Sequence, residues 1–121
     1  MTVTQFHDFP VADVDRDWDG TAAEKRVRSW AKADDGPNAA YRDAHVWYDS
    51  DKADNFGSYK FLIADVVNGQ LLVVPRGVMA AGGVIDGARG GADVPDDEVP
   101  RIKSHLARYY RKFDHTPPWE S

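Results

Sequence analysis

Tyr59-Lys-Phe-Leu-Ile-Ala-Asp-Val-Val-Asn-Gly-Gln-Leu-Leu-Val-Val-Pro75 consists of two apolar, β-rich runs joined by a tight turn. The runs span residues 59–67 and 70–74, and Asn68-Gly69 between them is the favoured pair for a two-residue type I′ turn. Both runs are nearly continuously apolar, so we expect both faces of this hairpin to be covered. A lone hairpin is marginal in water, and helices must therefore pack on it.

Helical patterns flank this hairpin on both sides. Upstream, Asp19 is typical of an N-cap and residues 21–33 of a helix. Its apolar stripe is Ala23, Val27, Trp30 and Ala31. Downstream, residues 76–86 suit a short helix of small residues, and residues from about 97 to 113 suit an amphipathic helix. The buried stripe of that last helix is expected to be Val99, Ile102, Leu106, Tyr109, Tyr110 and Phe113. Val46-Trp47-Tyr48 is a further candidate strand.

The length of 121 residues fits one domain, and the 42 % of apolar residues suffices for a core without disulfides. We expect an α+β fold, a compact single domain in which about three helices pack on the central β-hairpin. Residues 1–19 are expected to form an extended acidic arm, and residues 20–121 the domain. The arm has few apolar residues, and on this interpretation deleting residues 1–10 leaves the melting temperature nearly unchanged.

The charge balance narrows the classes of partner. A net charge of −5 disfavours the coating of nucleic acid or of an anionic membrane. Apolar runs fall short of the roughly 20 residues that a membrane helix needs. The start of the chain has neither the basic nor the apolar region of a secretion signal, so synthesis in the cytoplasm is expected. The chain has no cysteine, which excludes disulfides and thiol nucleophiles.

An incomplete metal motif precedes the first predicted helix. Asp15-Arg-Asp-Trp-Asp-Gly20 matches the first half of a calcium-binding loop, but Arg26 stands where the bidentate glutamate is required. We therefore interpret the segment as an acidic lead-in to a helix. The four histidines show no spacing typical of metal ligands, so no metal site is expected.

Patterns typical of catalysis are also incomplete. The glycines between residues 82 and 91 lack the Lys-Ser or Lys-Thr pair of a phosphate-binding loop. They are better suited to a helix end, a turn with positive φ and a close backbone approach. No serine lies in a G-x-S-x-G motif. We expect no catalytic residue, no cofactor and no enzymatic activity.

One basic stripe on the last predicted helix has two interpretations. Arg101, His105, Arg108 and Lys112 recur at i, i+4, i+7 and i+11. They can form a solvated helix face that partly balances the acidic arm. They can also contact an acidic protein surface or nucleic acid.

The order of several short motifs resembles a module in the head genes of tailed bacteriophages. These motifs are Tyr59-Lys-Phe-Leu-Ile-Ala-Asp-Val-Val-Asn-Gly, Val74-Pro-Arg-Gly-Val, Gly87-Ala-Arg-Gly-Gly, Val94-Pro, Ser104-His-Leu-Ala-Arg-Tyr-Tyr and Pro117-Pro-Trp. Trp18-Asp-Gly-Thr-Ala-Ala-Glu-Lys-Arg-Val-Arg-Ser-Trp and Phe56-Gly-Ser-Tyr-Lys fit the same pattern, so the resemblance spans residues 18–119. In that family the module often accompanies the capsid maturation protease, or is fused downstream of it. The protease acts through a separate domain, and the resemblance carries no protease residue over to this chain.

The resemblance implies a non-enzymatic structural accessory of a phage head, a decoration or minor capsid protein located in the virion. Its partner would be the major capsid protein, with formation of a homo-oligomer left open. The alternatives are an accessory or remnant subunit of the maturation protease and a nucleic-acid-binding module. The candidate partner-binding residues are Val3, Phe6, Phe9, Val11, Arg89, Arg101, Arg108, Lys112 and Trp119.

Overall fold

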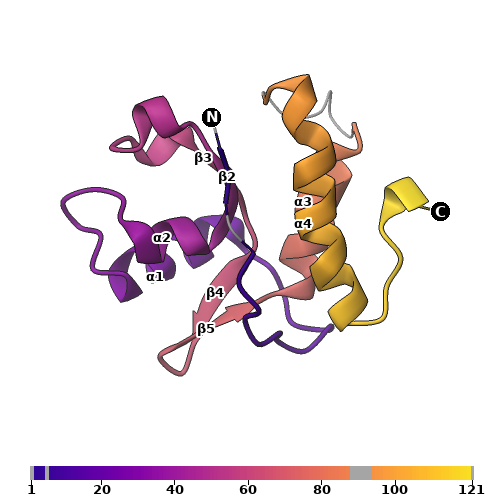
Figure 1. The fold of residues 1–121 in the computed structure, drawn as a ribbon. Helices are drawn as coiled ribbons and strands as arrows, with labels where there is room; N and C mark the ends of the chain where they lie inside the picture. The colour runs from indigo at the N-terminus through magenta and orange to yellow at the C-terminus, as the bar shows by residue number, and fades with distance from the viewer. Residues whose placement is uncertain (1, 5, 88–93, 121) are drawn as a thin grey trace.

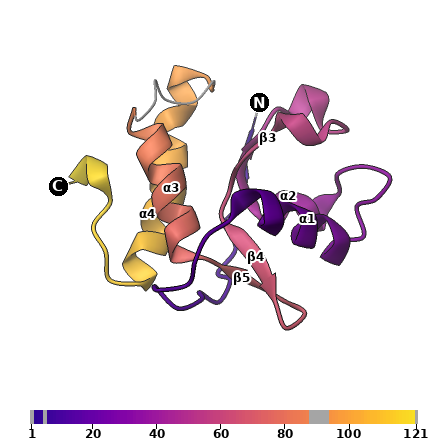
Figure 2. The same cartoon turned by 180° about the vertical axis from the view of Figure 1, so that it is seen from behind.

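A small sheet lies between two pairs of helices in the computed structural model, which describes residues 2–4, 6–87 and 94–120. In Figure 1, α1 (Gly20–Trp30) and α2 (Ala39–Asp43) lie on one side of the strands, and α3 (Pro75–Ile85) and α4 (Val99–Lys112) on the other. The reverse view in Figure 2 shows the same layers, with a second, two-stranded sheet below the first. This arrangement confirms the predicted single α+β domain.

The strands form two separate antiparallel sheets. The first has the order β1-β2-β3, with β1 at Thr2–Val3, β2 at His45–Tyr48 and β3 at Tyr59–Leu62. The second pairs β4 (Ala64–Val67) with β5 (Gln70–Val73). Asn68 and Gly69 connect β4 to β5 with φ values of 52° and 78°, and two positive φ values are what a type I′ turn requires. The predicted turn is confirmed, and so is the strand predicted around Trp47.

The prediction of one continuous strand over residues 59–67 is wrong. Phe61 has a φ of 61°, which a bulky side chain rarely adopts, and the chain changes direction there. Ile63 then connects the two sheets, because its N–H donates to Ala44 O (3.0 Å) and its carbonyl accepts from Val74 N (2.9 Å). The run is nearly continuously apolar because each half is covered by a different partner.

The first long helix begins where the sequence predicts and ends earlier. Asp19 is its N-cap, and the carboxylate accepts from Ala22 N at 3.1 Å. α1 ends at Trp30, and Lys32 just beyond it has a left-handed φ of 56°. Val27 is fully buried, whereas Trp30 is 38 % exposed. Trp30, a member of the predicted apolar stripe, is therefore not part of the buried core.

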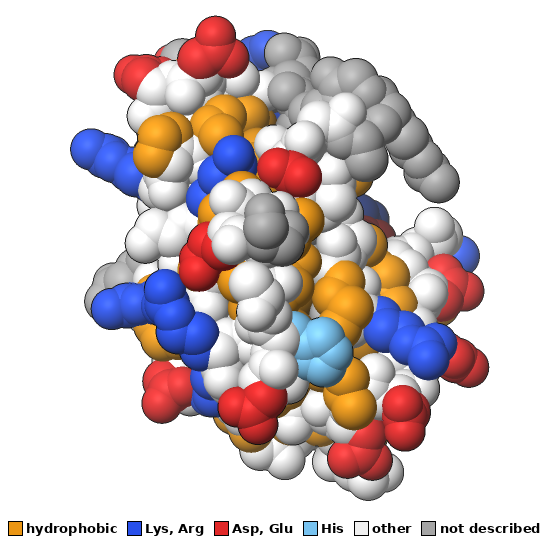
Figure 3. Space-filling model, turned by 90° about the vertical axis from the view of Figure 1, so that its right-hand side faces the viewer, with side chains coloured by type: hydrophobic (Ala, Val, Ile, Leu, Met, Phe, Trp, Pro, Cys, Tyr) orange, Lys and Arg blue, Asp and Glu red, His pale blue; other side chains and the backbone are white. Residues whose placement is uncertain are grey.

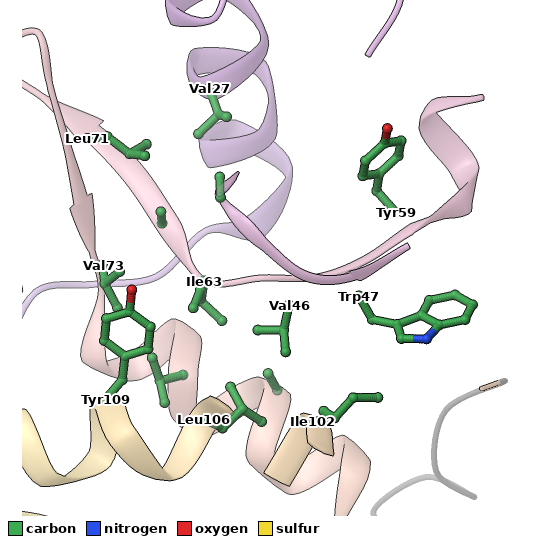
Figure 4. Packing of buried hydrophobic residues seen from close by; sticks show 14 of the residues in the cluster. Val27, Val46, Trp47, Tyr59, Ile63, Leu71, Val73, Ile102, Leu106 and Tyr109 are labelled. Atoms are coloured by element: carbon green, nitrogen blue, oxygen red, sulfur yellow. The ribbon is translucent and has the colours of Figure 1, made fainter. Parts of the chain in front are cut away.

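The core is a single cluster to which both helix layers and both sheets contribute (Figure 4). Side chains from α1, the two sheets and α4 point toward one another there, among them Val27, Val46, Ile63, Leu71, Val73, Ile102, Leu106 and Tyr109. Leu71 and Val73 on β5 are buried while Leu72 between them is only half-buried, as strand alternation requires.

The helices α3 and α4 approach closely because α3 carries a glycine at the contact. A Cβ atom at Gly82 would collide with the hydroxyl of Tyr110 on α4. One turn-and-a-half earlier on α3, a Cβ at Gly77 would lie 3.1 Å from the ring of Trp18. Gly87, which follows the helix, has a φ of 105°. These positions confirm the expected close approach and positive-φ turn.

Short 3-10 turns occur between the longer elements and near the end of the chain: η1 (Ser50–Lys52), η2 (Phe56–Ser58), η4 (Asp96–Glu98) and η5 (Pro118–Glu120).

An ion pair between the exposed Arg26 and the buried Asp65 joins α1 to β4. The Arg26 guanidinium donates to both oxygens of Asp65, each at 2.8 Å, and Asp65 is only 3 % exposed. Burial acts to raise the pKa of Asp65, but the hydrogen bonds from Arg26 and from the Val66 N–H outweigh it and lower that pKa. Arg26, the residue that breaks the calcium-loop pattern, is therefore a structural ion-pair partner.

Candidate functional site

The N-terminal arm lies along α4, and we call the contact of residues 3–4 and 6–9 with this helix the seam. Nδ1 of His105 lies 3.1 Å from Thr4 O, the Tyr109 hydroxyl donates to His7 O, and Lys112 Nζ donates to Phe9 O at 2.7 Å. Lys112 also forms an ion pair with Asp8. The arm therefore meets α4 over about two helical turns.

Apolar contacts close the same seam. The ring centroid of Phe6 lies 4.9 Å from that of Tyr109 and 5.6 Å from that of His105. The Arg108 guanidinium covers Phe6 at 4.6 Å from the ring centroid. The apolar arm residues predicted to bind a partner are partly buried and pack on the chain's own core: Val3, Phe6, Phe9 and Val11. These contacts lead us to expect that losing the arm destabilises the domain, contrary to the expectation from sequence.

Only half of the predicted basic stripe carries uncompensated charge. His105 is 8 % exposed, and burial, with a smaller contribution from the charge of Arg108, lowers its pKa to about 4. The prediction that His105 belongs to a solvent-facing basic stripe is therefore wrong. Lys112 is balanced by Asp8. Arg101 and Arg108 have no ion pair within the described part of the chain.

A small hollow of about 220 Å³ lies where the arm meets the first turns of α4. It is lined by Val3, Thr4, Phe6, Arg101, Ser104, His105 and Arg108. The structure thus brings together four of the predicted partner-binding residues, two apolar from the arm and two basic from α4. Two guanidinium groups beside a hydroxyl offer hydrogen-bond donors that suit a carboxylate.

The other predicted binding residues lie elsewhere. Val11 forms an isolated parallel bridge with Val73 at the edge of β5. Trp119 folds back on α4, with its ring 5.9 Å from that of Tyr110 and Lys103 Nζ 5.6 Å from it. Arg89 lies outside the described residues. The tail tryptophan therefore contacts the chain's own last helix.

A second and larger hollow, which we call the cleft, opens between α1, α2, η2 and β3. It has a volume of about 550 Å³ and is lined by Trp18, Gly20, Thr21, Glu24, Arg28, Tyr41, His45, Phe56, Gly57, Tyr59 and Leu62. Sequence reasoning missed it because these residues come from separate segments with no motif in common. The density of aromatic residues and the single Glu24-Arg28 pair at helical spacing were the available signals.

A hydrogen-bond network fixes the charged wall of the cleft. Oε2 of Glu24 accepts from the Tyr41 hydroxyl at 2.9 Å and from Arg28 Nη2 and Nε at 2.7 and 3.1 Å. The Arg28 guanidinium also lies 3.7 Å from the ring centroid of Phe56. Burial and the neighbouring Glu24 raise the pKa of Tyr41, so its hydroxyl stays protonated and donates.

His45 forms the floor of the cleft. It is 3 % exposed, its ring lies 4.6 Å from that of Tyr41, and Nδ1 lies 2.9 Å from Tyr41 O. Burial lowers its pKa to about 4, so the ring is neutral near pH 7. A carbonyl can only accept, so the one ring proton is on Nδ1 and Nε2 is an acceptor. No hydrogen bond to Nε2 is formed within the described residues.

A third hollow, of about 720 Å³, lies beside the acidic segment and is lined by Asp13, Asp15, Asp17, Asp19, Arg16, Arg26, Asp65 and apolar neighbours. Its two arginines both pair with Asp65, Arg16 Nη2 at 3.6 Å from the carboxylate. Within the described residues, no three acidic or histidine side chains are placed to hold a metal ion. No helix in the described part of the chain is long and apolar enough to cross a membrane.

Comparisons with known proteins returned no match to this chain, whether to family models, to curated proteins or to solved structures.

Proposed function

We propose that this protein is a non-enzymatic structural accessory of a tailed-phage head, which binds the assembled capsid shell as a decoration or minor capsid protein. The resemblance of residues 18–119 to a phage head module supports the assignment to a phage head. The observation that carries the proposal is the pair Arg101 and Arg108 at the seam, two cations without an ion-pair partner among the described residues of an acidic protein.

The seam offers the chemistry of a protein-binding surface. Guanidinium groups bind carboxylates in bidentate fashion, and Arg is enriched where interfaces bind most tightly. Val3 and Phe6, half-buried beside the two arginines, add apolar area to the same surface. A capsid shell presents many identical sites, so a modest contact per copy suffices if neighbouring copies associate. The expected target is an acidic segment of the major capsid protein.

Nucleic acid is a poorer fit to this surface. Proteins that bind DNA mainly through charge neutralise several phosphates with Lys and Arg. Of the predicted stripe only Arg101 and Arg108, two helical turns apart, carry uncompensated charge. On the face drawn in Figure 3, blue basic and red acidic side chains are interspersed around apolar ones. That pattern favours a protein partner over a polyanion.

Co-sedimentation with empty shells tests the proposal. The double variant Arg101→Glu/Arg108→Glu is expected to bind about tenfold more weakly, or about 1.4 kcal/mol. Lys103→Glu/Arg111→Glu makes the same change of charge on the same helix away from the hollow and serves as the control. Melting curves of both variants establish that each remains folded.

The outcomes separate the alternatives. If the wild-type protein does not sediment with its cognate shells, the decoration role is refuted, and a role beside the maturation protease becomes the leading alternative. If both double variants lose binding equally, bulk charge and not the seam is responsible. Retention of the wild-type protein on DNA, lost in the first variant, would instead support the nucleic-acid alternative.

A further inference from the structure

We propose that the cleft between α1, α2, η2 and β3 binds an uncharged, planar heteroaromatic ligand that donates N–H groups, of the kind found in amine-bearing nucleobases. This inference concerns a different surface from the seam and stands independently of the phage-head role. It rests on the shape of the walls, on which polar atoms are unused, and on the local charge.

The walls favour a flat ligand. Trp18, Phe56 and Tyr59 line the cleft with aromatic rings, and Leu62 completes the apolar surface. The cleft volume of about 550 Å³ falls within the range of known small-molecule sites. Aromatic side chains bind nucleobases by stacking on their π-faces. Trp18 is itself held in place by close packing against Gly77 of α3.

Two unused polar atoms of the cleft, His45 Nε2 and Glu24 Oε1, are acceptors, and they lie beside two donors without a hydrogen bond among the described residues, Trp18 Nε1 and Arg28 Nη1. Nε2 of His45 has no proton, because the single ring proton is required on Nδ1 for the contact with Tyr41 O. Oε2 of Glu24 receives all three donors of the network, and Oε1 has none among the described residues. A ligand that satisfies both atoms must bring hydrogen-bond donors.

The local charge of the cleft offers an ionic ligand no net attraction. The carboxylate of Glu24 is neutralised by the guanidinium of Arg28 at 2.7 Å. A cationic ligand would lose beside Arg28 what it gains beside Glu24, and an anionic ligand the reverse, so neither gains a net electrostatic attraction. We therefore expect the donors of the ligand to be uncharged N–H groups, such as ring or exocyclic amines.

The cleft is preformed for such a ligand. Tyr41 and His45 are 2 % and 3 % exposed, and the bonds from Tyr41 and Arg28 fix the Glu24 carboxylate. A ligand would then bind without the cost of ordering these side chains.

The test compares adenosine with purine riboside, which has the same rings and sugar but lacks the exocyclic amine. NMR titration of the full chain follows the ¹⁵N signal of His45 Nε2 and the indole N–H of Trp18. Adenosine is expected to bind saturably and shift both signals, and purine riboside to bind about fivefold to tenfold more weakly, as expected for one lost hydrogen bond. Adenosine monophosphate is expected to bind no more tightly than adenosine.

A matched pair of variants locates the site. Thr21 lies exposed at the mouth of the cleft, so Thr21→Phe should obstruct it without disturbing the core and weaken adenosine binding about tenfold. Lys25→Phe, exposed on the same helix outside the cleft, should bind like the wild type. The proposal is overturned if adenosine produces no saturable shift at millimolar concentration, if both nucleosides bind equally, or if Thr21→Phe has no effect.

Discussion

The seam and the cleft are built around the same device, a buried neutral histidine whose Nδ1 meets a backbone carbonyl beside a tyrosine ring. In the seam, His105 contacts the carbonyl of Thr4, 101 residues away along the chain. In the cleft, His45 contacts the carbonyl of Tyr41, four residues away. One histidine therefore joins distant segments, and the other shapes a local wall.

The surroundings of the two histidines have opposite polarity. His105 lies beside the guanidinium groups of Arg101 and Arg108, which can only donate hydrogen bonds, and His45 lies beside the carboxylate of Glu24, which accepts them. Thr4 connects the two regions, since its hydroxyl donates to His45 O at 2.6 Å while its carbonyl contacts His105. The comparison teaches that a buried imidazole alone does not define a site. The charged neighbours decide which ligand each surface can accept.

Deleting residues 1–10 is expected to have the largest effect, because it removes the contacts between distant segments that the seam has and the cleft lacks. The deletion removes β1, the Thr4 carbonyl and the packing of Phe6 and Phe9, and we expect the free energy of unfolding to fall by at least about 3 kcal/mol. Chemical denaturation measures it. The matched change in the cleft, Phe56→Ala, removes one half-buried ring and should cost about 1–2 kcal/mol. An unchanged unfolding midpoint in the truncated protein would show that the seam does not stabilise the domain.

Acid titration tests whether the two histidines are equivalent. Each has its pKa lowered from 6.5 to about 4, so the unfolded chain binds protons first as the pH falls. The stability from each neutral histidine is complete above about pH 6.5 and declines toward pH 4, by up to about 1.4 kcal/mol per pH unit. Denaturant melts between pH 7 and 4.5 measure the slope.

Asparagine in place of either histidine keeps an N–H donor near Nδ1 and removes the titration. His105→Asn and His45→Asn should each flatten the slope by a similar amount. If only one variant changes the slope, the imidazole at the other site is not held neutral, and the parallel between the two regions fails.

The smallest effects are expected from the two tyrosine hydroxyls. Tyr109→Phe removes a hydrogen bond to His7 O in the seam, and Tyr41→Phe removes one to Glu24 in the cleft. Each should cost about 0.5–1.5 kcal/mol in thermal or chemical melts. Only Tyr41→Phe should also weaken adenosine binding, because Glu24 loses a bond that positions it. Equal effects on binding would show that the two regions are coupled through Thr4.

The sequence predicts those features of the fold that rest on local chemistry. Asp19 at the start of α1 and Asn68-Gly69 in the hairpin depend on their own backbone geometry, and both occur as expected. The break at Phe61 was not predictable, because an apolar run looks the same whether one or two partners cover it. The burial of His105 escaped prediction because the segment that covers it lies about a hundred residues upstream.

The candidate sites likewise divide into features set by local sequence and features set by contacts between distant segments. Arg101 and Arg108 could be chosen from helical spacing, since i and i+7 share a face. Lys112 differs from these two arginines because Asp8 neutralises its charge, and His105 differs because the Thr4 segment buries it. No spacing rule indicates either contact. The cleft required the tertiary structure, because its floor and its charged wall come from different elements.

The arm contacts a helix about a hundred residues further along the chain, and this separation affects the order in which parts of the protein fold during synthesis. Residues 4–9 leave the ribosome about a hundred residues before their partners on α4. Contacts of such high sequence separation carry a large loop-closure entropy and form late in folding. The hairpin and α1 can assemble early from neighbouring segments, and β1 can pair with β2 once residue 48 has emerged. The contacts of Thr4, His7 and Phe9 with α4 must wait until nearly the whole chain has been made. Cotranslational protection of the Phe6 region is therefore expected only after α4 has been synthesised.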